Sequence, residues 1–131
     1  MKKTATFLAA LLLLSACGDD NTTAPLDPFE PQVTNAMDSF QLQATDVTDV
    51  GTTLQYSWEN SGTQAVVDHS TTVAAGSAML VIRDAGGTVV YDQGLAPSLN
   101  EDTASGSSGT WTITLTLAQY SGTLNFRVQK K

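Results

Sequence analysis

The only histidine of the chain, His69, has the widest chemical scope, because an imidazole can gain or lose a proton near neutral pH. It stands between Asp68 and Ser70, the two residue types that would complete a hydrolase triad. Neighbouring residues on a strand point to opposite faces, however, so Asp68 and Ser70 cannot orient His69 locally. The chain also lacks a Gly-x-Ser-x-Gly nucleophile turn. We therefore expect His69 to be a structural residue with a hydrogen bond. A hydrolase that uses His69 with distant partners is the third of three functions considered, after a binding or structural module and a carbohydrate-binding module.

Acidic residues are the second group that could do chemistry. Asp46 and Asp49 share the first expected loop, and Glu101 and Asp102 share the largest one. Loops at one end of a β-sandwich can converge on calcium, which takes about six to eight oxygen ligands. These four residues are therefore the calcium candidates, although the chain has no EF-hand spacing or Asp-rich repeat. The alternative is that they cap turns and keep the domain soluble.

No other metal or cofactor is expected from the composition. Zinc and copper sites usually need several nitrogen or sulfur ligands, and the chain has one histidine and one cysteine. A glycine-rich phosphate loop is absent as well. We accordingly expect no catalytic residue and no metal ligand beyond the calcium candidates, and we expect that the chain is not an enzyme.

Two tryptophans, Trp58 and Trp111, could serve as stacking platforms for sugar rings. Each is in register with large apolar neighbours two residues away, such as Tyr56 and Ile113. Residues two apart on a strand share a face, so core packing is the expected role of both tryptophans.

The amino-terminal segment carries the most specific motif. Two lysines follow Met1, an apolar run occupies residues 7–14, and Leu14-Ser15-Ala16-Cys17 ends it. A basic start, a short apolar segment and small residues before a cut are typical of a secretory signal peptide. The run is too short for a transmembrane helix, which needs about 20 apolar residues. Leu14–Cys17 resembles the bacterial lipobox at all four positions.

This resemblance implies that the chain is a bacterial lipoprotein with signal peptide 1–16. It implies diacylglycerol on the Cys17 sulfur, cleavage before Cys17 and an N-acyl chain on the new amino terminus. Two or three acyl chains anchor a protein stably, whereas one binds only marginally. In enteric bacteria, an Asp directly after the lipidated cysteine favours the inner membrane. Here Gly18 follows, so the resemblance favours the outer membrane of a Gram-negative host.

The processed chain, residues 17–131, has the length of one acidic domain. It contains thirteen acidic and four basic residues, which give a formal charge of −9. The basic residues are Arg83, Arg127, Lys130 and Lys131. This charge argues against binding to nucleic acid and against attraction to anionic headgroups. Once Cys17 is acylated no thiol is left for a disulfide, so a packed core or bound ions must supply the stability.

Residues 18–34 contain three prolines and four acids, which argue against a helix or a strand. We therefore expect residues 17–34 to comprise the lipidated cysteine and a flexible tether, with the folded domain at 35–131. The alternative that part of the tether packs on the domain applies to Phe29 and Val33.

The dominant pattern from residue 38 onward alternates apolar and polar residues, which is typical of half-buried strands. Strong turn signals such as Asp84-Ala-Gly-Gly87 separate some of these segments. The polar stretch Ser98–Gly109 is the largest expected loop. The seven expected strands are 40–44, 54–58, 65–73, 78–83, 88–93, 111–117 and 124–128.

Seven short strands without helical periodicity predict an all-β antiparallel sandwich, Ig-like or of a similar Greek-key topology. A small barrel is the second choice. The closing strands, from Gly109-Thr-Trp onward, resemble the end of small secreted β-sandwich modules attached to bacterial exoenzymes, which are non-catalytic. The expected function is a membrane-anchored, non-catalytic binding or structural module, and the second alternative is a carbohydrate-binding accessory module. The expected partners are the membrane, through the lipid anchor, and an envelope protein or glycan.

Overall fold

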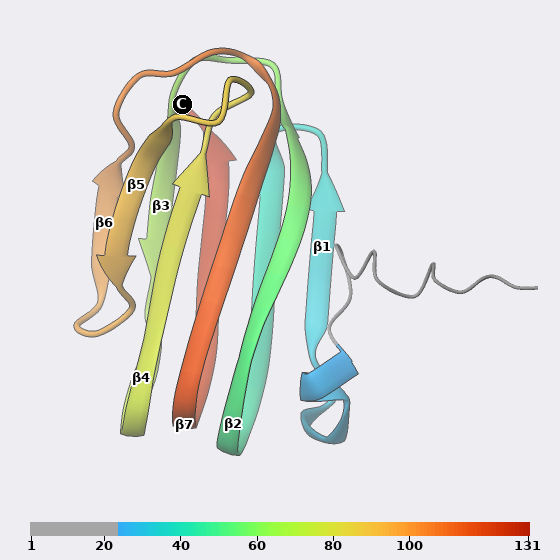
Figure 1. Ribbon diagram of the computed structural model, residues 1–131, viewed down its shortest axis with the longest axis vertical. Coiled ribbons are helices and arrows are strands. Elements are labelled where there is room, and N and C mark those ends of the chain that lie inside the picture. Colours follow the sequence, from blue (N-terminus) through green and yellow to red (C-terminus); the bar gives the residue numbers. More distant parts are fainter. Residues whose placement is uncertain (1–23) are drawn as a thin grey trace, which may run out of the picture.

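A computed structural model describes residues 24–131, whose regular structure is almost entirely β-strand (Figure 1). A six-residue 3₁₀ helix, η2 (Ala24–Phe29), precedes the strands. All strand pairs are antiparallel and join into one seven-stranded sheet, which confirms the predicted all-β class and the strand number. The strands are β1 (Gln32–Ala36), β2 (Ser39–Asn60), β3 (Ala65–His69), β4 (Thr72–Arg83), β5 (Val89–Gly94), β6 (Leu99–Asp102) and β7 (Gly109–Lys130).

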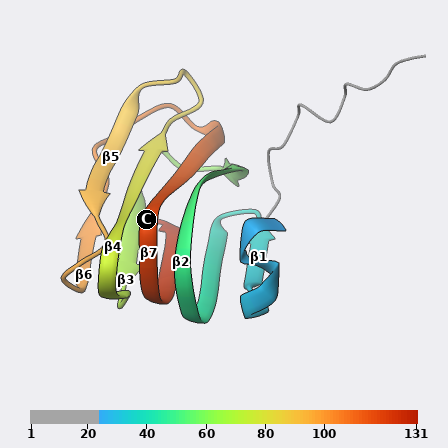
Figure 2. The same ribbon diagram turned by 60° about the horizontal axis from the view of Figure 1, so that its bottom comes forward.

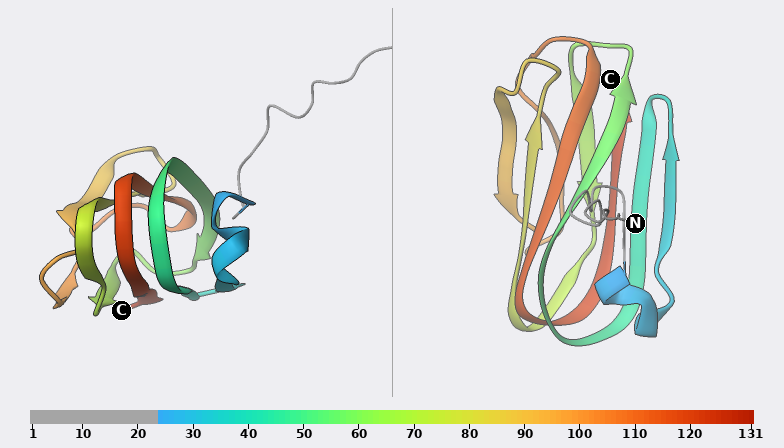
Figure 3. Two further views of the ribbon diagram at one scale, coloured as in Figure 1. Left: turned by 90° about the horizontal axis from the view of Figure 1, so that it is seen from below. Right: turned by 45° about the vertical axis from the view of Figure 1, so that its right-hand side comes forward.

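The single sheet forms a sandwich because β2, β4 and β7 curve from one layer toward the other (Figures 2 and 3). Residues 39–47 of β2 pair with residues 122–129 of β7, and the remaining halves of the two strands pair with each other. The back layer therefore runs β1–β2–β7–β3–β6. The front layer holds the other halves of β2 and β7, together with β4 and β5.

The bends of the long strands coincide with unusual backbone conformations. The β2–β7 and β4–β7 registers shift at the same places, so the bends are β-bulges. A Cβ atom on Gly122 would lie 2.2 Å from the Thr72 carbonyl oxygen, so glycine is required there. Residues with positive φ at the bends are Asp46 (56°), Asp49 (50°), Gly76 (71°), Gln119 (46°) and Gly122 (150°).

The alternating apolar residues of both layers meet in one core. Phe40 of the back layer packs against Tyr56 of the front layer, with ring centroids 5.0 Å apart. Trp58 and Trp111 are both fully buried, which confirms the prediction that they are core residues. The alternation that identified the strands therefore identifies the core faces as well.

Four of the expected strands are halves of two longer ones. Residues 40–44 and 54–58 belong to β2, and 111–117 and 124–128 belong to β7. Bulges interrupt the period-two pattern between the halves, so each half has the pattern of a separate strand. The expected strand 65–73 is likewise divided between β3 and the start of β4.

Two strands lie in segments that were expected to be irregular. β1 is exposed along its whole length and β6 is at most half-buried, so neither carries an apolar pattern. η2 and the first part of β1 fall within the expected tether 17–34, and β6 falls within the expected loop 98–109. The η2 helix packs on the domain through Leu26, whose side chain is fully buried in the core.

Candidate functional site

The outer surface of the back layer carries rows of polar side chains across its strands. One row of cross-strand partners consists of Thr34, Gln41, Arg127, Asp68 and Asn100. The adjoining row consists of Gln32, Gln43 and Asn125. We call these eight residues, together with Ser70, the polar face. It combines carboxamide, guanidinium, carboxylate and hydroxyl groups on a rigid sheet.

A hollow of about 210 Å³ lies on the polar face over β2, β7 and β3, lined by Gln41, Asp68, Ser70, Asn125 and Arg127. Arg127 donates a hydrogen bond to the Asp68 carboxylate at 3.1 Å. Asn125 Nδ2 donates to Ser70 Oγ at 3.0 Å. These bonds hold the side chains in place, while Arg127 and Asp68 remain 45% and 41% exposed and keep further donors and acceptors for a ligand.

A second hollow of about 230 Å³ lies at the η2 end of the polar face, lined by Phe29, Glu30, Gln32, Gln43 and Thr45. Phe29 packs partly against the core, and the buried Leu26 fixes η2 against β2. An aromatic ring beside amide and carboxylate groups offers apolar and polar contacts together. Both hollows are smaller than about 300 Å³, the low end for drug-sized ligands, so each suits one small polar unit.

His69 lies on the inner side of the back layer and is only 2% exposed. Asp68 and Ser70 line the polar face on the opposite side, as expected for strand neighbours. Neither nitrogen of the His69 ring makes a hydrogen bond of good geometry, although the Leu95 backbone lies close enough to favour the charged ring. A triad from these three neighbours does not form.

Glu101 of β6 lies near His69 and also beside Tyr91 of β5. We call these three residues the buried trio. The Tyr91 hydroxyl and Glu101 Oε1 are also buried without a hydrogen-bond partner. Burial lowers the pKa of His69 and outweighs the opposing effects of Glu101, the Leu95 backbone and Asp68. Burial also raises the pKa of Tyr91, and the nearby Glu101 carboxylate raises it further.

The four calcium candidates are divided between the bend of β2 and the edge strand β6. The Asp46 and Asp49 amides donate to the hydroxyls of Thr123 and Ser121. Glu101 points inward to the buried trio, whereas its neighbour Asp102 forms an ion pair with Lys131.

No metal-binding group of three His, Asp or Glu side chains occurs within residues 24–131. Helices long and apolar enough to cross a membrane are also absent from this range. Cys17 and the rest of the lipobox lie outside the described residues.

Asp84, which the sequence places in the turn signal of the middle hairpin, organises one end of the sandwich. Its Oδ1 accepts hydrogen bonds from the Gly86 and Thr88 amides at 3.0 and 2.8 Å, and its Oδ2 accepts one from the Ser107 amide at 2.9 Å. These bonds, Ser107 first, hold the pKa of Asp84 below its ordinary value. The turn signal Asp84-Ala-Gly-Gly87 located the hairpin, but the contact with Ser107 has no local sequence signal.

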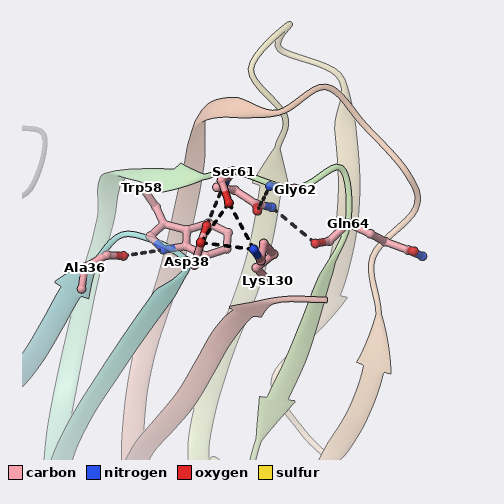
Figure 4. A network of polar contacts seen from close by, with 8 residues as sticks. Ala36, Asp38, Trp58, Ser61, Gly62, Gln64 and Lys130 are labelled. Atoms are coloured by element: carbon pink, nitrogen blue, oxygen red, sulfur yellow. Dashed lines mark hydrogen bonds and ion pairs between the residues drawn. The ribbon is translucent and has the colours of Figure 1, made fainter.

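Asp38 forms a second network, between the β1–β2 turn and the C-terminal strand (Figure 4). Its carboxylate accepts hydrogen bonds from the Ser61 amide and hydroxyl at 2.8 and 2.9 Å, and Lys130 Nζ lies 3.5 Å away. The Ser61 amide is the main cause that lowers the pKa of Asp38. Neither Asp38 nor Asp84 lines either hollow, so their networks are structural and the polar face is the candidate binding site.

Comparisons with family models and with curated proteins find no match for this chain. Among solved structures, the chain is similar to the C-terminal CBM6 of LamC, a marine laminarinase from Zobellia galactanivorans. The similarity covers 77% of this chain and 89% of that chain, with 9% sequence identity and a TM-score of 0.36. At this level it supports no conclusion about function.

Proposed function

We propose that this chain is an envelope lipoprotein whose β-sandwich is a non-catalytic module that binds a neutral glycan through the polar face. The observation that carries the proposal is that both hollows open on this one face and share its adjoining rows. Gln43 of the second hollow is the cross-strand partner of Asn125 in the first. Two small neighbouring hollows suit a ligand built of small repeating polar units.

The chemistry of the polar face favours sugar hydroxyl groups as partners. A hydroxyl both donates and accepts hydrogen bonds, and the carboxamides of Gln41, Gln43 and Asn125 do the same. Phe29 can cover the apolar face of a sugar ring at the second hollow. The formal charge of −9 disfavours an anionic polymer, so a neutral glycan is the better ligand.

The arrangement favours binding over hydrolysis. Most glycoside hydrolases place two carboxyl groups on either side of one glycosidic bond. Asp68 and Glu30 line different hollows, and Asp68 is engaged by Arg127. This separation supports a module that holds its ligand without cleaving it.

The anchoring part of the proposal rests on the lipobox resemblance. Acyl chains on Cys17 would hold the chain in the outer membrane, as Gly18 favours. Cys17 and Ala24 are seven residues apart, a distance that an extended chain spans with at most about 25 Å. The module would therefore act close to the membrane that anchors it.

Binding can be tested with the full chain in mild detergent by affinity electrophoresis in gels that contain neutral glucan, xylan or mannan. We expect retardation by at least one polysaccharide and a tenfold or larger loss of affinity in Gln41→Ala and Asn125→Ala. Gln55→Ala is the matched control, because Gln55 is an exposed glutamine of β2 in the front layer. Absence of retardation in every gel, or equal losses in the control, would refute the proposed function.

A further inference from the structure

The buried trio joins the two layers at one edge of the sandwich. His69 ends β3 and Glu101 belongs to β6, which are neighbours in the back layer, while Tyr91 comes from β5 of the front layer. Four polar atoms of these side chains are buried without a hydrogen-bond partner: His69 Nδ1 and Nε2, the Tyr91 hydroxyl and Glu101 Oε1. Buried polar groups are almost always paired, because burial without a hydrogen bond costs free energy. The unpaired groups of this cluster therefore destabilise the closed arrangement of β3, β5 and β6.

The strand that covers the trio is short and lies at an edge of the sheet. β6 is four residues long and pairs only with β3, which leaves its other edge free of strand partners within residues 24–131. An ion pair between Asp102 and Lys131, whose side chains are 40% and 50% exposed, holds β6 from outside the sandwich. The chain is fixed on either side of β6, because Leu95 and Thr103 are buried and their amides donate to the Ala78 and Ala65 carbonyls. Short edge elements with few contacts open locally at a lower free-energy cost than the core.

We propose that the β3–β6 edge is an acid-sensitive latch, in which protonation of His69 releases β6 while the rest of the sandwich stays folded. A charged imidazole is costly among buried groups that do not bond to it. Release of β6 exposes the ring and Glu101 to water and removes that cost.

Several groups surround His69, and their effects oppose one another. Glu101 on β6, the Leu95 backbone before β6 and Asp68 on β3 favour the charged ring, whereas burial disfavours it and dominates. Tyr91 of β5 lies beside Glu101, and β7 places Phe126, which carries no charge, directly opposite His69. Asp68 is itself engaged by Arg127 on the outer surface.

The direction of the pH dependence follows from these environments. In the released state the ring meets water and titrates near its ordinary pKa of 6.5, whereas in the closed state its pKa is lower. The released state therefore binds more protons between these two values. The opening equilibrium should rise by up to about tenfold per pH unit as the pH falls below 6.5, and level off below the closed-state pKa.

Release of β6 would also change one end of the polar face. Asn100 lies on β6 and is the cross-strand partner of Asp68. Opening of the latch would separate Asn100 from the row that contains Asp68 and Arg127. The latch itself is independent of what the polar face binds.

Hydrogen exchange followed by mass spectrometry tests the latch on the full chain in mild detergent, between pH 7.5 and 4.5, with rates corrected for intrinsic exchange. The amides of β6, residues 99–102, should lose protection by up to tenfold per pH unit below 6.5. Peptides that cover residues 53–59 of the front layer should stay protected. Constant protection at 99–102, or a parallel loss at 53–59, would overturn the proposal.

Two variants separate the roles of the groups. His69→Gln cannot titrate and should abolish the pH dependence, whereas Lys131→Ala should lower the protection of β6 at every pH without changing the slope. An unchanged slope in His69→Gln would contradict the proposal. Because His69 is the only histidine, its ring signal in NMR gives a reading on the wild-type chain even if His69→Gln fails to fold. An apparent pKa at or above 6.5 would overturn the latch.

Discussion

The rings of Trp58 and Trp111 meet edge to face in the core, with centroids 5.9 Å apart and planes at 90°. The two residues are direct cross-strand partners on β2 and β7. Trp58 Nε1 donates to the Ala36 carbonyl at 3.0 Å, and Trp111 Nε1 donates to the Ser107 carbonyl at 2.7 Å. The pair therefore links the core to β1 and to the segment before β7, with no indole left to stack on a ligand.

Truncation of either tryptophan should be strongly destabilising. We expect Trp58→Ala and Trp111→Ala each to lower the free energy of unfolding by about 3–5 kcal/mol, because each removes a large, fully buried side chain. Urea denaturation measures this loss, with Met37→Ala as an exposed control near zero. In the wild-type chain the emission should be blue-shifted. Strong quenching by acrylamide or by oligosaccharides would show that a tryptophan is accessible.

Asp84→Ala should destabilise the domain more than Asp92→Ala, a substitution at an exposed residue of the adjacent strand β5. The alanine leaves the amides of Gly86, Thr88 and Ser107 without their acceptor. Thermal unfolding at neutral pH compares the two variants. Equal melting temperatures would show that the Asp84 carboxylate does not fasten this end of the sandwich.

The charge of Asp84 should also make stability depend on acid pH. Its folded-state pKa lies below the ordinary 3.8, so its contribution is fully present above pH 3.8 and is lost as the pH falls through the folded-state value. We expect the urea midpoint of the wild type to fall between pH 5 and pH 2, and Asp84→Asn to show a smaller fall. A variant that loses as much stability as the wild type would contradict this origin.

The fold class could be predicted because its signal is local. Alternation in β2 and β7 marks the buried faces, including Trp58 and Trp111, and it needs no knowledge of the partner strand. The continuity of these strands could not be predicted, because bulges at Asp46 and Gln119 break the alternation where the chain bends. β1 and β6 could not be predicted, because short, exposed edge strands need few apolar residues and so carry no alternating pattern.

The candidate site was harder to predict than the fold. The polar face depends on strand register, which places Gln41 beside Arg127 although they are far apart in the sequence. Glu101 was singled out as a calcium candidate, but its position beside Tyr91 depends on how β5 and β6 meet across the layers. Tertiary geometry of this kind leaves no pattern in a single sequence.

Leu26→Ala tests whether the folded domain begins ahead of β1. The Leu26 side chain is fully buried in the core, so the substitution should lower the free energy of unfolding by about 2–5 kcal/mol. Met37→Ala, at a side chain that is 69% exposed, again serves as the control. A neutral Leu26→Ala would place residues 24–30 outside the cooperative unit.

Cys17→Ser tests the proposed anchor. The serine variant should leave the membrane fraction, because it lacks the sulfur that would carry the diacylglycerol. The intact mass of the wild type should show added acyl chains on a chain that begins at Cys17. A serine variant that still sediments with membranes, or a wild type without added mass, would rule out lipidation.

The binding account is tested most directly by NMR titration of the chain with soluble oligosaccharides of glucose, xylose, mannose and N-acetylglucosamine. Side-chain amide signals report on both surfaces, since Gln41, Gln43 and Asn125 lie on the polar face and Gln55 lies on the front layer. We expect at least one sugar series to shift the signals of Gln41, Gln43 and Asn125 while Gln55 stays unchanged. Shifts confined to Gln55 and the front layer, or no shifts with any series, would contradict the account.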